Sequence, residues 1–107
     1  MDKKSVQGKI KKYLKSLPAI GIHPYFAVLF GSFAEGRANK WSDIDIIVIA
    51  PEFDQKYDFS LVETMWEIRS DTDSRLEPIP CGMKEWESGD GRPIIEVARK
   101  EGIVIKA

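Results

Sequence analysis

Apolar and polar residues follow two different spacings along the chain, and these spacings predict where helices and strands form. Residues 2–17 carry apolar side chains every three or four positions, which is the spacing of an amphipathic helix. The apolar stripe consists of Val6, Ile10, Tyr13, Leu14 and Leu17. Most lysines of this segment fall outside the stripe, and Pro18 and Gly21 end the helix.

Two short, continuous apolar runs follow, and each predicts a buried strand. Residues 25–30 read YFAVLF and stop abruptly at a Gly-Ser pair, which is typical of a strand covered on both faces. Residues 43–50 read DIDIIVIA, are rich in β-branched side chains and are closed by Pro51. The polar segment 32–42 connects the two runs and has room for a short helix at its start.

The rest of the chain alternates between helical and extended patterns. The expected order is a helix at 58–70, a turn at 71–74, an extended segment at 75–81, a helical turn at 83–88, a helix at 93–101 and a strand at 103–106. Pro78 and Pro80 favour an edge strand or an irregular end for the extended segment over a central strand, because proline donates no ladder hydrogen bond. This order predicts the α/β (α+β) class, a small sheet flanked by helices, within a single domain of residues 1–107.

Composition and charge narrow the functional classes. A chain of 107 residues fits one domain and is too short to include a separate acceptor-binding domain. The 16 basic and 17 acidic residues give a net charge of −1, which excludes a globally basic surface for nucleic acid. The single cysteine, Cys81, excludes an intrachain disulfide and a cysteine-based metal cluster. No apolar run approaches a signal peptide or a membrane span, so we expect a cytoplasmic protein.

Two carboxylates at the start of the second apolar run are the main candidates for chemistry. Asp43 and Asp45 are two positions apart, so their side chains point to the same face of a strand. Such a pair is costly to bury unless a cation neutralises it, and carboxylate oxygens suit Mg²⁺. A third carboxylate from a neighbouring strand would complete a two-metal site. Glu77 is the first candidate for it, with Asp71 and Asp73 as alternatives.

The Gly-Ser pair at 31–32 adds a phosphate-binding segment to this picture. A glycine lets the backbone approach a ligand, and the N–H groups of a following helix start face an anion. Nucleotidyl or phosphoryl transfer needs a phosphate-binding segment next to a divalent-metal site.

The Gly-Ser pair, ten further residues and then Asp-Ile-Asp, with apolar strands on either side, resemble the DNA polymerase β nucleotidyltransferase superfamily. The chain is similar in size to the smallest branch, the minimal nucleotidyltransferase (MNT) domains, and the resemblance covers roughly residues 25–107. It implies a polymerase-β-like fold with a small mixed sheet. It also implies a nucleoside triphosphate substrate, with ATP favoured, and Mg²⁺, expected as two ions.

The resemblance assigns a role to each matching residue. Asp43 and Asp45 match the two metal-binding acids, and Glu77 matches the third acid, which activates the acceptor hydroxyl in the superfamily. Gly31 and Ser32 match the pair that holds the triphosphate.

The position directly after the Gly-Ser pair departs from the pattern of the MNT domains. Many MNT domains carry an arginine directly after Gly-Ser, where this chain has Phe33. Arg37 and Lys40 are the first basic residues that follow, and both are candidates for nucleotide binding.

The resemblance also implies a partner. MNT domains are commonly paired with helical HEPN proteins in toxin–antitoxin systems, in which the antitoxin transfers AMP to a toxin tyrosine. We therefore expect an antitoxin of this kind. The alternatives are a non-catalytic binding antitoxin and a free-standing transferase that acts on a small molecule or a nucleic-acid end.

Two further features have simpler interpretations. Trp41 is expected to pack beneath its loop in preference to stacking near a base. The lysines of residues 2–17 are expected to form a solvated helix face.

Overall fold

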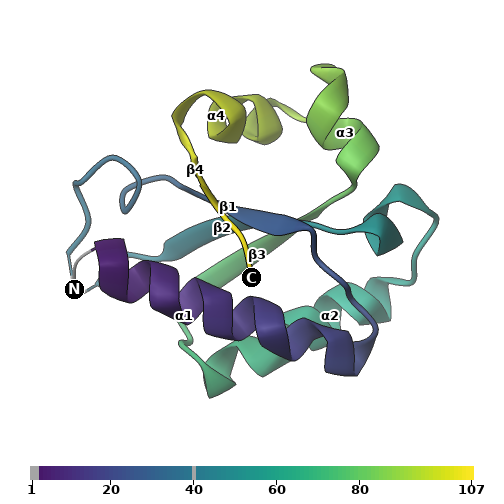
Figure 1. Cartoon of the computed structure of the whole chain (residues 1–107), viewed down its shortest axis with the longest axis horizontal. Coiled ribbons are helices and arrows are strands. Elements are labelled where there is room, and N and C mark those ends of the chain that lie inside the picture. Colours follow the sequence, from purple (N-terminus) through teal and green to yellow (C-terminus); the bar gives the residue numbers. More distant parts are fainter. Residues whose placement is uncertain (1–2, 40) are drawn as a thin grey trace.

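Four strands form one mixed sheet in the computed structural model, which describes residues 3–39 and 41–107 (Figure 1). The strands are β1 (Phe26–Phe30), β2 (Ile44–Ile49), β3 (Leu76–Cys81) and β4 (Ile103–Ile105). Their spatial order is β3-β2-β1-β4. β1 pairs antiparallel with β2 and β4, and β2 pairs parallel with β3. The expected small mixed sheet flanked by helices is confirmed.

Helices cover both faces of the sheet. α1 (Lys3–Ser16) and α2 (Phe59–Glu67) lie along one face, and α3 (Met83–Ser88) and α4 (Pro93–Glu101) lie on the other (Figure 1). The described residues also include three 3₁₀ helices that extend or connect these elements: η1 (Leu17–Ile20), η2 (Pro51–Asp54) and η3 (Ile68–Asp71). The helix expected at 58–70 is therefore split into α2 and η3.

Side chains alternate between the two faces of β2, so this strand contributes to a hydrophobic cluster on each face of the sheet. Ile44, Ile46 and Val48 pack into the cluster shared with α1 and α2. Ile47 and Ile49 pack into the second cluster, beneath α3 and α4. Asp45 has the parity of the second set, so its carboxyl group lies on the face that carries α3 and α4.

β3 is an edge strand, as its two prolines predict. The carbonyl groups of Arg75 and Cys81 accept hydrogen bonds from the β2 side, at Ile44 N (2.8 Å) and Ala50 N (3.1 Å). Odd-numbered residues of β3 therefore direct their backbone groups toward β2, whereas Pro78 and Pro80 direct theirs toward the open edge.

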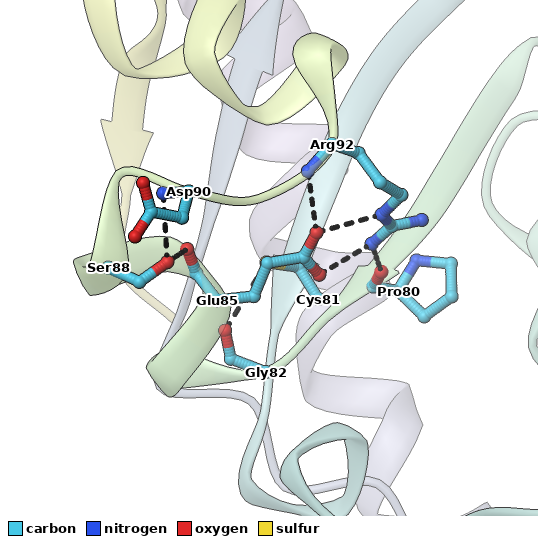
Figure 2. A network of polar contacts seen from close by, with 7 residues as sticks. All are labelled: Pro80, Cys81, Gly82, Glu85, Ser88, Asp90 and Arg92. Carbon is cyan, nitrogen blue, oxygen red and sulfur yellow. Dashed lines mark hydrogen bonds and ion pairs between the residues drawn. The ribbon is translucent and has the colours of Figure 1, made fainter.

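The connection between α3 and α4 is tied to the end of β3 by one charged pair (Figure 2). The Glu85 carboxylate accepts hydrogen bonds from the Arg92 side chain and from the Arg92 backbone N, each at 3.0 Å. Arg92 Nη2 also donates to the carbonyl oxygen of Pro80 at 2.6 Å. This network attaches the α3–α4 connection to the sheet.

No helix in the part of the chain that the structure describes is long and apolar enough to span a membrane.

Asp73 connects three segments that are distant in the sequence. Its carboxylate accepts hydrogen bonds from Lys9 Nζ of α1 at 2.7 Å and from Arg75 Nη2 at 2.8 Å. The Arg75 guanidinium in turn lies 5.8 Å from the centre of the Phe33 ring. Asp73 thus links α1, the start of β3 and the segment that follows β1.

We expect Asp73→Asn to lower the free energy of unfolding near neutral pH by about 1.5–3 kcal/mol, the usual range for hydrogen bonds to charged groups. Arg75, and then Lys9, hold the pKa of Asp73 well below its usual range. The carboxylate therefore contributes fully above the pKa of an unfolded aspartate, about 3.9, and loses this contribution as the pH falls further.

Urea denaturation at neutral and at acidic pH tests this prediction. The difference in unfolding free energy between the wild type and Asp73→Asn should be large at neutral pH and should shrink in acid. Asp71→Asn, a change at an exposed acid two residues away, should have little effect at either pH. A difference that does not depend on pH would contradict the assignment.

Candidate active site

Strand pairing brings the acids of two strands to the same edge of the structure. Asp45 is the cross-strand partner of Glu77 in the parallel β2–β3 pair, and their carboxyl groups are within hydrogen-bonding reach. Asp43 lies just before β2 and interacts electrostatically with both carboxyl groups. The three acids therefore form one cluster where β2 and β3 begin and β1 ends.

Burial and mutual repulsion of negative charge raise pKa values within this cluster. Burial raises the pKa of Asp45, and the neighbouring Asp43 raises it further. The pKa of Glu77 is also raised, by burial and then by the charges of Asp43 and Asp45. Among residues 3–39 and 41–107, the ion pairs formed by lysine, arginine and histidine all involve other acids.

This donor set fits Mg²⁺ held together with a bound phosphate chain. Carboxylate oxygens are hard ligands, and Mg²⁺ commonly takes one or two of them and completes its octahedron with water and phosphate oxygens. In the described part of the chain, no three His, Cys, Asp or Glu side chains are arranged to hold a metal ion by themselves. The three acids therefore do not form an all-protein cage, and a metal ion here would need further oxygen ligands.

Gly31 lies directly against this cluster. It follows the last residue of β1, whose cross-strand partner is Asp45, and its φ is +74°. A Cβ atom added at Gly31 would lie 2.5 Å from Asp45 Oδ2. The backbone angle favours glycine here, and a Cβ atom at this position would displace the Asp45 carboxylate.

The segment after Gly31 forms consecutive turns, and the short helix allowed by the sequence pattern does not form. Glu35 N donates to the carbonyl oxygen of Gly31 at 3.1 Å, and Arg37 N donates to that of Ser32 at 2.9 Å. Gly36, with a φ of +75°, ends the turns. Ser32, half-buried, thus lies in a turn directly after Gly31 instead of in the first turn of a helix.

Phe33, the residue after the Gly-Ser pair, is part of the hydrophobic core. It is buried in the core cluster shared with α1 and α2. The position where many MNT domains have an arginine therefore serves packing in this chain.

Of the two basic candidates for nucleotide binding, Arg37 and Lys40, the structure describes only Arg37. Arg37 is exposed, and its guanidinium forms an ion pair with Glu35 within the same turn. Lys40 lies outside the described residues.

The alternatives to Glu77 do not join the cluster. Asp73 is engaged with Lys9 and Arg75, and Asp71 is an exposed residue of η3.

Trp41 differs from its expected packing. Its side chain is 80% exposed, so it does not pack beneath the loop. An apolar residue beside a polar segment can be buried or exposed, and the sequence does not distinguish the two. The tertiary structure shows which one occurs.

A surface pocket lies elsewhere. It has a volume of about 460 Å³ and lies between η1, η2 and the start of α2, where Glu52, Tyr57 and Leu61 line it. These elements follow β2 and precede β1, so the pocket is at the opposite end of the sheet from the acids.

Comparison with known protein families gives one match. The family model described as "Nucleotidyltransferase domain" matches residues 8–101, a span that includes the acid cluster and the Gly-Ser pair. A comparison with curated proteins found no significant match.

Proposed function

Because the chain belongs to the nucleotidyltransferase domain family, of the polymerase-β-like superfamily, we propose that it transfers AMP from ATP to a hydroxyl group of a partner protein. The observation that carries the proposal is the cluster of Asp43, Asp45 and Glu77 beside Gly31. Among residues 3–39 and 41–107, none of the ion pairs found in the structure involves these carboxylates, and paired carboxylates are suited to Mg²⁺ and a triphosphate.

The proposed reaction is an in-line substitution at the α-phosphorus. Asp43 and Asp45 hold Mg²⁺, which neutralises phosphate charge when it is bound. The backbone around Gly31 and the hydroxyl group of Ser32 hold the phosphate chain. The acceptor oxygen forms a bond to the α-phosphorus, the bond to the β-phosphate oxygen breaks, and pyrophosphate leaves. Glu77 accepts the proton of the acceptor hydroxyl.

The acceptor that we propose is a tyrosine of a helical HEPN-type toxin, which makes this chain the antitoxin. The resemblance to MNT domains supports this proposal. The exposure of Asp43 at the rim of the cluster also supports it, because a protein side chain needs an open approach to the α-phosphorus.

Intact-mass measurement tests the proposal. The purified chain is incubated with ATP, Mg²⁺ and a HEPN-type protein encoded next to it, and the partner should gain the mass of one AMP. Omission of ATP should abolish the gain. Inhibition of the partner without a mass change would support a non-catalytic antitoxin. Transfer of label from [α-³²P]ATP only to a nucleic-acid end or a small molecule would support a free-standing transferase.

A further inference from the structure

Trp41 is the most exposed large apolar side chain among residues 3–39 and 41–107. Its exposed fraction of 80% exceeds that of Phe59, the next in order, at 70%. Exposing a tryptophan forgoes the burial of one of the largest apolar surfaces that a side chain offers. Single exposed apolar side chains are common on protein surfaces, so the exposure of Trp41 gains meaning only from its place near the acid cluster.

The turn that carries Trp41 is held by hydrogen bonds. Trp41 N donates to Asn39 Oδ1 at 2.8 Å, and Asn39 N donates to Ser42 Oγ at 3.0 Å. Ser42 N donates to the carbonyl oxygen of Asn39 at 3.1 Å. These contacts connect the backbone of Trp41 and of Ser42 to Asn39, and the Trp41 side chain is largely exposed to solvent.

The position of this turn distinguishes Trp41 from the other exposed aromatic residues. Trp41 precedes Asp43 by two residues, or at most about 7 Å of extended chain. Tyr25 precedes β1, and Tyr57 and Phe59 follow β2, so these three lie at the opposite end of the sheet. The length of β2, six residues or roughly 20 Å, separates the two ends.

We propose that the Trp41 indole stacks on the nucleobase of the nucleotide whose phosphates bind at the acid cluster. This inference rests on the proposed function, because it requires a nucleoside triphosphate at that site. The base is the flat, weakly polar part of such a molecule, and stacking on an aromatic ring is its most favourable contact with an exposed side chain.

The same contact determines which nucleotides are preferred. Stacking tolerates every base because each has a π-face, and a purine covers more of the indole than a pyrimidine. ATP and GTP should therefore bind more tightly than CTP and UTP, and this preference should depend on Trp41.

Equilibrium binding with two probes tests the proposal without relying on turnover. The first probe is ATP with Mg²⁺, and the second is inorganic tripolyphosphate with Mg²⁺, which has the phosphates and no base. Trp41→Ala should raise the dissociation constant for ATP by about 5- to 100-fold and leave that for tripolyphosphate unchanged. Trp41→Phe should retain most of the affinity for ATP. Phe59→Ala removes an exposed aromatic residue at the far end and should leave both constants unchanged.

The other outcomes overturn the proposal in distinguishable ways. Equal weakening of ATP and tripolyphosphate by Trp41→Ala would mean that the residue only shapes the loop. Unchanged ATP affinity, together with normal AMP transfer, would refute the stacking contact and leave the proposed function intact. Failure of the wild-type chain to bind either probe would refute both.

Discussion

Replacing Asp45 with asparagine should lower the rate of AMP transfer by roughly 10³-fold or more, because the charge that positions the metal and the phosphates is lost. The same substitution should leave the free energy of unfolding at neutral pH unchanged or higher. Burial and Asp43 raise the pKa of Asp45, so at neutral pH its ionised form is less favourable in the folded chain than in the unfolded chain. A loss of transfer activity without a loss of unfolding free energy would indicate that the Asp45 carboxylate contributes to function and not to stability.

Two measurements on the same samples check this prediction. Label transfer from [α-³²P]ATP reports the chemistry, and the melting temperature with and without MgATP reports binding. MgATP should raise the melting temperature of the wild type and have little effect on Asp45→Asn. Asp71→Asn alters an exposed acid outside the cluster and should behave as wild type in both assays. If Asp43→Asn and Asp45→Asn both retained full transfer, the assignment of the cluster would be wrong.

Replacing Gly31 with alanine should reduce both stability and activity. The φ of +74° disfavours any residue with a Cβ, at a cost of about 1–2 kcal/mol. The new methyl group would also lie 2.5 Å from Asp45 Oδ2, so the carboxylate must move. A displacement of about 1 Å in a reacting group can lower the rate by about 10²-fold.

Gly21 provides a matched control for the backbone term. Its φ is +89°, and an added Cβ would meet nothing within 4 Å. Gly21→Ala should therefore show a similar loss of unfolding free energy in urea denaturation, with unchanged transfer activity per folded molecule. If Gly31→Ala were no less active than Gly21→Ala, the contact between Gly31 and Asp45 would have no role in catalysis.

The sequence pattern predicted the parts of this structure that depend on local periodicity. The two-residue repeat of β2 places Asp45 on one face, and Pro78 and Pro80 identify an edge strand; both agree with the observed sheet. The strand register that sets Glu77 opposite Asp45 is a tertiary property, so the sequence indicated a neighbouring-strand acid but not its partner.

Other features of the structure were not predicted, because no pattern of neighbouring residues in the sequence indicates them. Asp73 bonds to Lys9, 64 positions away, and no spacing rule connects the two residues. The helix allowed after Gly31 is replaced by turns, because Gly31 and Gly36 both adopt a positive φ that an α-helix excludes. The exposure of Trp41 is likewise a tertiary property, and the expectation that it packs beneath its loop is wrong.

The prolines of β3 also determine how this chain can assemble with others. Because the backbone of Pro78 and Pro80 faces the open edge, that edge has no N–H donor at either position. A strand from another molecule therefore finds an interrupted ladder there, which protects the half of the sheet that carries Asp45 and Glu77 from edge-to-edge aggregation. The only other sheet edge among the described residues is β4, so a partner that docks by strand addition must do so at β4, two strands away from Asp45.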